Sequence, residues 1–239
     1  TKAIIAVNWA GKFADYKALK SFGVPVIEDA AHTWDSFTTV ESIERGDYIC
    51  YSFQAIKFLT TSDGGILICP PEQEERARLL RWYGLDRTKN ESFRCTQNIK
   101  YAGFKYHMND VCATVGIENL KHFKEIIGKH RNNASYYDSE LNDVSGLNLL
   151  KREKGHDSAF WIYSLLVENR DGFYKWMKEC NIIVSQVHER NDKHTCVREY
   201  KTPLPTLDKT IGKVVSIPVG WWISKDEREY IVECIKKGW

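Results

Sequence analysis

Short runs of almost uninterrupted apolar residues alternate with helical patterns along the first half of the chain. The runs TKAIIAVNW (1–9), VPVIEDAAH (24–32), DYICYSF (47–53) and GGILIC (64–69) have the length and the β-branched content of buried strands. Strands that are apolar on both faces are typical of mainly parallel sheets that helices cover on each side. This feature therefore predicts an α/β fold built on such a sheet.

The intervals between these runs carry helical patterns. Helices are predicted at 14–23 (ending at Gly23), at 72–84, from 109 to about 141 with a break near Gly128, and at 224–239 with Ser224 as its cap. A further strand, helix and strand are predicted at 160–168, 172–181 and 182–188. We place a domain seam in the long helical region. It separates a larger α/β domain, 1–125, from a connecting helix and a smaller C-terminal α/β domain, 126–239.

Composition narrows the class of function. The 239 residues include 34 basic and 32 acidic side chains, and the resulting charge of +2 lacks the basic excess that a nucleic-acid surface requires. Seven cysteines without any C-x-x-C pair indicate reduced, mostly buried thiols. No apolar run reaches the length of a membrane span, and no signal peptide is visible. We therefore expect a cytoplasmic protein that binds neither nucleic acid nor membrane.

Polar side chains follow two of the predicted strands at the ends where ligands of open α/β sheets bind. Glu28 and Asp29 close the second strand, with His32 shortly after them. Ser52 closes the third strand, and Lys57 follows it within the stretch YSFQAIKFLTTSDGG. We expect these groups to meet at one end of the sheet.

This combination of groups suits a particular chemistry. Apolar neighbours weaken the hydration of an ammonium group, which lowers the pKa of Lys57 and provides a nucleophilic amine. Such an amine condenses with an aldehyde, while a carboxylate such as Asp29 holds a pyridine nitrogen in its protonated form. The residues therefore suggest a cofactor that carries an aldehyde on a pyridine ring.

Each residue also has a simpler explanation, which the pattern alone leaves open. Lys57 can extend its ammonium group to water from an apolar turn, and Asp29 can cap the segment after its strand. His32 can be a hydrogen-bonded structural histidine, and Ser52 by itself indicates nothing. The four residues together are more specific than any one of them.

Three blocks of the sequence carry a resemblance to a known family. VPVIEDAAH, YSFQAIKFLTTSDGG and GFKYHMNDVCATVGIENL (103–120), in this order and spacing, resemble the DegT/StrS-type nucleotide-sugar aminotransferases. These are enzymes that depend on pyridoxal 5'-phosphate (PLP) and have the aspartate-aminotransferase fold, fold type I. The similarity extends through most of the chain and weakens after about Ser145. It implies that residues 1–125 are part of a PLP-binding large domain.

The resemblance implies a role for each residue at the strand ends. Lys57 would form the Schiff base with PLP and later transfer a proton, and Asp29 would pair with the pyridinium nitrogen. His32 would lie near the 3-oxygen of the cofactor, and Ser52 would donate to its phosphate. A related branch of sugar 3-dehydratases has histidine at the lysine position, so the presence of Lys57 favours transamination over dehydration.

Some positions depart from the common family pattern. Phe58 follows the lysine where asparagine is frequent, and the block GFKYHM differs from the usual G-aromatic-Asn-Tyr-Arg-Met. That block can contact the phosphate of a neighbouring subunit, so Lys105 and His107 are candidates for cofactor binding, although His107 is equally a candidate for a packed or surface histidine. Family members also carry an N-terminal portion, with a phosphate-binding turn, before the point at which this chain starts. We therefore expect a chain that lacks the N-terminal part.

The segment 182–200 gathers several polar residues that resemble metal ligands, namely His188, Glu189, Asp192, His194 and Cys196. Their spacing is irregular for zinc, and we expect a solvated loop rather than a metal site. Under the family resemblance this loop faces the mouth of the active site. His188 and Arg190 are then candidates for contacts to the sugar or the diphosphate of the substrate.

The expected function is therefore transfer of an amino group to a nucleotide-linked keto-sugar, in amino-sugar or polysaccharide biosynthesis. The family resemblance implies an amino-acid donor, glutamate by analogy, and a homodimer. Two alternatives stay open. One is a catalytically inactive remnant of the fold that acts as an interaction module, and the other is a related PLP-dependent sugar dehydratase.

Overall fold

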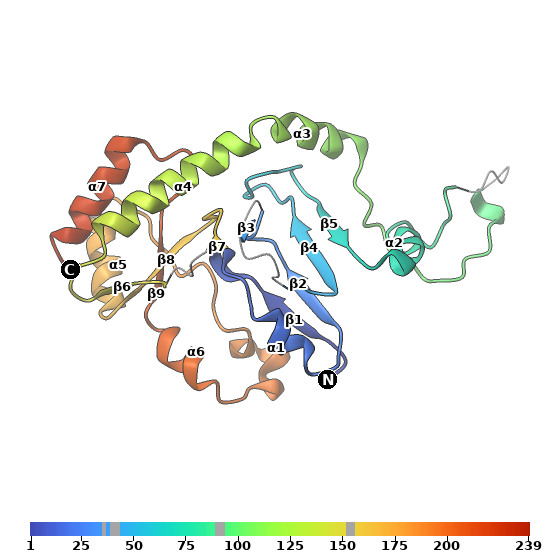
Figure 1. The fold of residues 1–239 in the computed structure, drawn as a ribbon, viewed down its shortest axis with the longest axis horizontal. Coiled ribbons are helices and arrows are strands. Elements are labelled where there is room, and N and C mark those ends of the chain that lie inside the picture. The colour runs from blue at the N-terminus through green and yellow to red at the C-terminus, as the bar shows by residue number, and fades with distance from the viewer. Residues whose placement is uncertain (35–36, 39–43, 89–93, 152–155) are drawn as a thin grey trace. The chain divides into compact units, whose positions relative to one another are not determined.

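The computed structural model describes residues 1–34, 37–38, 44–88, 94–151 and 156–239, and these residues form two compact units (Figure 1). Unit 1 comprises Thr1–Trp9, Phe13–Trp34 and Glu41–Phe123. Unit 2 comprises Ala10–Lys12, Asp35–Val40 and Lys124–Trp239. The two units have separate sheets.

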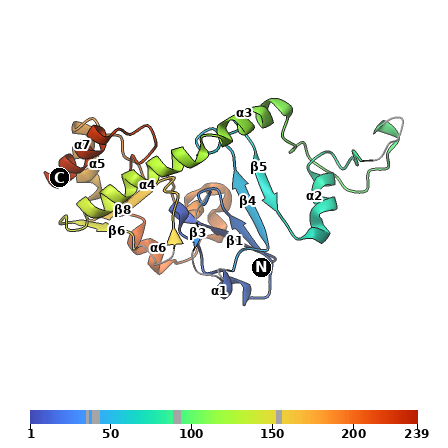
Figure 2. The same cartoon turned by 45° about the horizontal axis from the view of Figure 1, so that its top comes forward.

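A four-stranded sheet forms the centre of unit 1. Its strands lie in the order β1 (Ile4–Val7), β2 (Val26–Asp29), β4 (Tyr48–Ser52) and β5 (Gly65–Ile68) (Figure 1), and Figure 2 shows β4 beside β5. β1, β2 and β4 run parallel, with Asp29 opposite both Val7 and Cys50, whereas β5 is antiparallel to β4. The sheet is therefore mainly parallel, as the apolar runs predicted, and the carboxyl ends of β2 and β4 lie at the same end of it.

The helices of unit 1 lie between β1 and β2 and after β5. They are α1 (Tyr16–Lys20), α2 (Glu74–Leu80) and α3 (Asp110–Leu120), and short 3₁₀ turns of the chain lie at Trp9–Gly11, Pro71–Gln73, Arg94–Thr96, Asn191–Lys193 and Thr195–Tyr200. The Asn109 side chain caps α3 by accepting the N–H of Cys112 at 2.9 Å. Gly23, whose φ of +69° suits glycine, ends the turn after α1 where the sequence predicted the stop.

The long helical region breaks at a different place from the one predicted. It consists of α3 and α4 (Phe123–Glu140), and the break lies at Lys121 and His122 rather than near Gly128. Gly128 lies inside α4, with nothing within 4 Å of the position that a Cβ would take. A glycine inside a helix costs only about 1 kcal/mol relative to alanine. The prediction was wrong because one such residue does not end a helix of this length.

An antiparallel sheet forms the centre of unit 2. Its strands lie in the order β6 (Leu147–Leu149), β8 (Tyr163–Val167) and β9 (Val214–Ile217), and β3 (Phe37–Thr38) pairs separately with β7 (His156–Asp157). The helices of the unit are α4, α5 (Arg170–Glu179), α6 (Pro205–Thr210) and α7 (Lys225–Lys236). Tyr137, Leu165, Met177 and Ile235 are fully buried in the core between these elements.

Residues 182–188 do not form the strand that their apolar pattern predicted. Ser185 makes only an isolated bridge to Ser216 on β9, with N–H···O distances of 3.1 and 2.6 Å. Ile183 is 88% exposed, and Val187 has a φ of +64°, outside the extended region. The prediction was wrong because the backbone turns at Val187 instead of continuing the pairing.

The N-terminus of α7 carries the cap that its sequence predicted. The Ser224 hydroxyl accepts the N–H of Glu227 at 3.2 Å, and the Glu227 carboxylate accepts the N–H of Ser224 at 2.8 Å. We expect Ser224→Ala to lower the free energy of unfolding by about 1 kcal/mol, because a helix N–H loses its acceptor. Urea denaturation followed by circular dichroism measures this change.

A matched control for this prediction is Ser139→Ala, which removes an exposed serine hydroxyl from α4. Its effect on the free energy of unfolding should stay within about 0.5 kcal/mol. Equal losses in the two variants would contradict the stabilising role of the cap.

Candidate active site

Lys57 lies on a loop that backbone hydrogen bonds close between β4 and β5. The N–H of Phe53 donates to the carbonyl of Gly64 at 2.8 Å, and the N–H of Thr61 donates to the carbonyl of Phe53 at 3.0 Å. Within the loop, the N–H of Lys57 donates to the carbonyl of Gln54 at 2.9 Å. The Lys57 side chain therefore starts from a fixed turn just beyond the carboxyl end of β4.

Helix α3 supports this loop. The Asn119 side chain donates to the carbonyl of Thr60 at 2.9 Å, and a Cβ at Gly116 would come within 2.5 Å of the Thr61 methyl group. Phe58, the residue after the lysine, is only 5% exposed. It acts here as a packing residue where the family pattern often has asparagine.

Lys57 is half-buried. Burial lowers the pKa of Lys57 to about 8, although the Asp29 carboxylate partly offsets this effect by raising it. An uncharged amine is therefore more available near neutral pH than on an exposed lysine. In the unfolded chain the pKa of Lys57 is about 10.5, so between about pH 8 and 10.5 the unfolded chain binds more protons than the folded one. The contribution of Lys57 to the free energy of unfolding therefore rises as the pH increases through this window.

We expect the reactivity of Lys57 toward an acylating reagent to rise with a midpoint near pH 8. Asp29→Asn should move this midpoint to lower pH, because it removes a negative charge that favours the ammonium form. Pulse labelling followed by peptide mass spectrometry measures the midpoint, with the exposed Lys121 as internal reference. Identical profiles for Lys57 and Lys121, or a shift to higher pH in Asp29→Asn, would contradict the effect of burial and of the carboxylate.

Asp29 ends β2 at the same end of the sheet. Its Oδ1 accepts the N–H of Ala31 at 3.0 Å, which fixes the carboxylate against its own backbone. Burial raises the pKa of the Cys50 thiol, and the charge of Asp29 raises it further. The same charge acts on Lys57. The structure therefore brings the carboxylate and the amine within electrostatic reach of each other.

Aromatic rings surround the segment after β2. His32 is 5% exposed, and its ring meets that of Trp9 edge-on at 6.2 Å between centroids. Trp34 stacks on Phe53 at 5.2 Å and donates through Nε1 to the carbonyl of Ser52 at 3.1 Å. The Ser52 hydroxyl accepts a backbone N–H at 3.2 Å and keeps its own proton to donate to another group. Trp34 was missed in the sequence, where its only signal is an aromatic residue close after His32.

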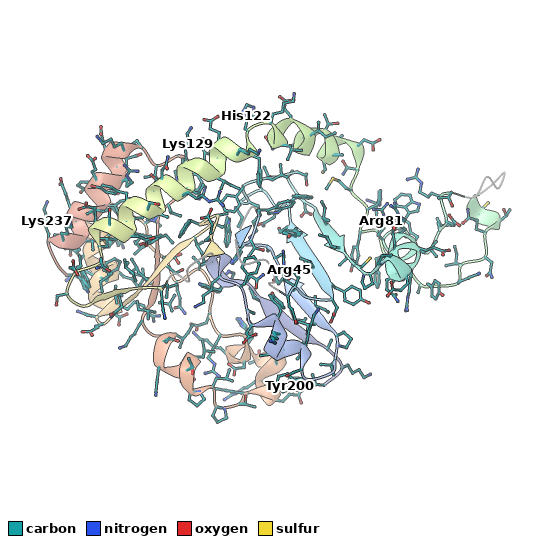
Figure 3. All side chains as sticks on the ribbon, in the orientation of Figure 1. Arg45, Arg81, His122, Lys129, Tyr200 and Lys237 are labelled. Carbon is teal, nitrogen blue, oxygen red and sulfur yellow. The ribbon has the colours of Figure 1, made fainter. Side chains whose placement is uncertain are left out.

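A buried ionic network beneath the end of β2 was also missed. Glu28 is fully buried, and its carboxylate accepts bonds from Asn8 Nδ2 at 2.8 Å, from the N–H of Gly46 at 3.0 Å and from two nitrogens of Arg45 at 2.5 to 3.0 Å. Figure 3 shows Arg45 next to the strands of unit 1. The network joins the segments after β1 and before β4 to β2, and it holds the strand that ends in Asp29. An acid inside an apolar strand is the signal that a buried partner exists.

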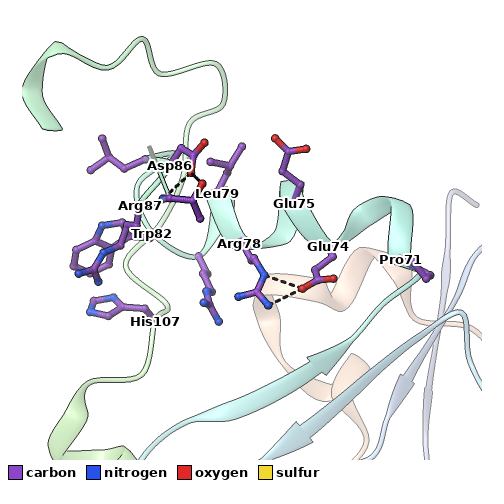
Figure 4. Close-up of a pocket in the computed structure, with 12 residues that line it drawn as sticks. Pro71, Glu74, Glu75, Arg78, Leu79, Trp82, Asp86, Arg87 and His107 are labelled. Carbon is purple, nitrogen blue, oxygen red and sulfur yellow. Dashed lines mark hydrogen bonds and ion pairs between the residues drawn. The ribbon is translucent and has the colours of Figure 1, made fainter. Parts of the chain in front are cut away.

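Lys105 and His107 lie beside α2. The backbone of Lys105 pairs with that of Trp82, and the His107 ring meets Trp82 edge-on at 3.7 Å between centroids. A pocket of about 440 Å³ opens here, and His107, Trp82, Arg81 and Arg87 are part of its lining (Figure 4). Burial lowers the pKa of His107, and the charges of Lys105, Arg87 and Arg81 lower it further. Its Nδ1 is buried and has no hydrogen-bond partner among the described residues.

His188 and Arg190 belong to unit 2. His188 is exposed, whereas the Arg190 side chain is only 13% exposed. Arg190 donates to the carboxylates of Asp192 and Asp208 and to the carbonyl of Thr202. The guanidinium therefore organises its own loop, and a bound phosphate would have to compete with these acceptors.

Within the described ranges, no group of three or more histidine, cysteine, aspartate or glutamate side chains is arranged to hold a metal ion. In the loop that resembled such a site, Asp192 is paired with Arg190 and Glu189 with Lys193. No helix in the described part of the chain has the length and apolar character to cross a membrane.

Comparison with known proteins shows to which family the chain belongs. A model of the DegT/DnrJ/EryC1/StrS aminotransferase family matches residues 1–236. The chain belongs to this family. Among solved structures, AtS13 from Actinomadura melliaura is 39% identical with a TM-score of 0.93, and the sugar aminotransferase CalS13 from Micromonospora echinospora is 35% identical with a TM-score of 0.92. Both similarities cover 100% of this chain, and 67% and 68% of the respective solved chains.

A curated relative shows similarity at the level of sequence. The UDP-4-amino-4-deoxy-L-arabinose–oxoglutarate aminotransferase of Shewanella sediminis is 32% identical over 199 residues, which cover 76% of this chain and 51% of the relative. The chain thus spans about half to two thirds of the length of these family members. The comparisons confirm the predicted family, a family of PLP-dependent sugar aminotransferases, and the predicted α/β fold.

Proposed function

We propose that this chain forms part of a PLP-dependent aminotransferase that moves an amino group from glutamate to a nucleotide-linked keto-sugar, in amino-sugar biosynthesis. The observation that carries the proposal is the Lys57 amine, whose pKa is lowered to about 8 at the end of a mainly parallel sheet, within electrostatic reach of Asp29. The Shewanella relative is named for a UDP-linked amino sugar and for oxoglutarate, the acid that remains when glutamate gives up its amino group. That name supports glutamate as the donor.

The residues present fit PLP. Its aldehyde requires an uncharged amine, which burial favours at Lys57, and its pyridine nitrogen requires a carboxylate partner, which Asp29 provides. When bound, PLP supplies a carbon that carries the transferred amino group and a protonated ring that accepts electrons from the substrate. Ser52 retains a hydroxyl proton for the phosphate of the cofactor.

Lys57 has two tasks in the proposed reaction. Its uncharged amine would hold the cofactor, and the same nitrogen would then accept and release the proton that moves during the reaction. A pKa of about 8 suits both tasks, because the nitrogen both accepts and releases a proton near neutral pH. Asp29, fixed by the N–H of Ala31, keeps the proton on the ring nitrogen.

The remaining candidates complete the proposed site. We place the buried His32 beside the ring oxygen of the cofactor, and Lys105 and His107 at the phosphate of a neighbouring subunit. The cations around His107 support an anionic ligand there. We place His188 and Arg190 at the sugar diphosphate of the substrate. Arg190 would there release the Asp192 carboxylate and donate to a phosphate oxygen instead.

The proposed organisation follows from the same roles. Residues 1–125 would belong to the cofactor-binding domain, and residues 126–239 would form a connecting helix and a C-terminal domain. A homodimer would bring Lys105 and His107 to a second site, and the exposed apolar residues Val111 and Ile117 on α3 support a contact surface. A cytoplasmic location is supported by the seven cysteines, all of which are free thiols.

Reductive trapping followed by an activity assay tests the proposal. After incubation with PLP and borohydride, we expect a pyridoxyl group on the peptide that contains Lys57. With glutamate and a UDP- or dTDP-linked keto-sugar, we expect oxoglutarate and an amino sugar in equal amounts. No label on Lys57 at saturating PLP would instead support an interaction module, and loss of water from the sugar without amine transfer would support a dehydratase.

A further inference from the structure

The loop that carries Lys57 is buried on one side of the lysine and exposed on the other. After the lysine, Phe58, Leu59 and Thr61 are each at most 6% exposed. Before it, residues 54–56 are exposed to solvent. The position of the lysine therefore depends on how the buried segment after it is held.

Helix α3 lies against this buried segment. The Asn119 amide donates to the carbonyl of Thr60 at 2.9 Å, although 59 residues separate the two along the chain. Three residues before Asn119, a Cβ at Gly116 would come within 2.5 Å of the Thr61 side chain, so the helix and the loop approach closely there. Positions three residues apart share one face of a helix. Thr60 and Thr61 thus rest on the same face of α3, one through a hydrogen bond and the other through direct contact.

The same loop holds an unfavourable backbone conformation. Ser62 has a φ of +71°, in the left-handed region that favours glycine. Its N–H donates to the Thr60 hydroxyl at 2.9 Å, and this hydroxyl donates to the carbonyl of Phe53 at 3.2 Å. Such a conformation persists only where the surrounding contacts fix it. Thr60 is therefore a fixed point of the loop, and Asn119 holds its carbonyl.

We propose that Asn119 is a positioning residue for Lys57, which holds the lysine loop on α3 and thereby keeps the lysine half-buried. Without this bond, the Thr60 carbonyl would turn toward water to regain a donor, because an unpaired carbonyl is costly inside a protein. The loop would then move away from α3, and the lysine amine would gain hydration. The inference rests on the role proposed for Lys57, because it gives Asn119 a part in keeping that amine uncharged.

Acylation of Lys57 in the chain without cofactor tests the proposal. Asn119→Leu keeps the size of the side chain but removes the donor, so the midpoint of labelling should rise from about pH 8 toward pH 10.5. A rise of about one pH unit would lower the labelling rate at pH 8 by about fivefold, relative to the rate at high pH. The substitution leaves the charge of Asp29, which acts on Lys57, unchanged. Asn119→Gln, which keeps an amide donor, should show a smaller rise.

Gly116→Ala provides a second, independent variant. Alanine favours a helix more than glycine does, so α3 should not weaken, but the added Cβ would push the Thr61 side chain and its loop away. We expect the midpoint of Lys57 labelling to rise again. Ser224→Ala, which loses the cap of α7 in unit 2, is the control for a general loss of stability, and its midpoint should stay near that of the natural chain.

Circular dichroism shows whether each variant is folded. Unchanged midpoints in folded Asn119→Leu and Gly116→Ala would overturn the proposal, and Gly116→Ala alone decides if Asn119→Leu does not fold. An equal rise in Ser224→Ala would also overturn it, because general stability rather than the contact with α3 would then set the midpoint. Absence of a pyridoxyl group on Lys57 after incubation with PLP and borohydride would instead reject the proposed function, and the midpoints would still decide the role of Asn119.

Discussion

Lys57→Ala should abolish amine transfer, with a fall in kcat of at least about 10³-fold. A single positioned acid–base group contributes roughly 10² to 10⁴, and this variant also loses the covalent attachment of the cofactor. Lys57→Arg should fail to a similar extent, because a guanidinium keeps the positive charge but does not provide an uncharged nitrogen at neutral pH. Oxoglutarate release under saturating glutamate and keto-sugar measures kcat.

Controls separate chemistry from folding in this experiment. Lys121→Ala removes an exposed lysine that follows α3 and pairs with Glu118 in the last turn of that helix, and it should leave kcat unchanged. Circular dichroism should show Lys57→Ala folded, because the substitution removes a side chain whose charged form burial disfavours. Near-parental turnover in Lys57→Arg would contradict the proposed role of the amine.

Arg45→Ala should lower the free energy of unfolding by about 3 kcal/mol, because it leaves the fully buried Glu28 carboxylate without a cation. The expected value is at the low end for a buried pair, because the Arg45 side chain is 33% exposed and water already weakens the attraction. Urea denaturation monitored by near-ultraviolet circular dichroism measures the loss.

The matched control is Arg78→Ala, which breaks an exposed pair with Glu74 one helical turn away (Figure 4). It should cost no more than about 0.5 kcal/mol. Adding Glu28→Gln to Arg45→Ala should recover part of the loss, because the buried group no longer carries a charge. Equal costs for the two arginine variants would contradict the burial argument.

The main features of the fold could be predicted because they follow from local patterns. Strands that are apolar throughout indicated a mainly parallel sheet, and Ser224 indicated the start of α7. Two local predictions were wrong. Gly128 favoured a break, but one glycine does not end a helix as long as α4. Residues 182–188 favoured a strand, but the backbone turns at Val187.

The candidate site was only partly visible in the sequence. Lys57 and Asp29 could be paired because both follow parallel strands, whose carboxyl ends meet at one end of the sheet. The partnership of Glu28 with Arg45 and the contact of Trp34 with Ser52 join residues that are far apart in sequence, and no periodicity marks such pairs. Asp208, a carboxylate partner of Arg190, was hidden for the same reason, whereas the other partner, Asp192, lies only two residues away.

The two acids that end β2 are consecutive, and successive side chains of a strand project to opposite faces. Glu28 is fully buried and paired with Arg45, while its neighbour Asp29 remains partly accessible on the other face of the strand. The strand thus carries a buried, paired carboxylate on one face and a partly accessible carboxylate on the other. Substitutions around Asp29 can therefore change the chemistry of its face of β2 while the pair of Glu28 with Arg45 on the other face stays intact.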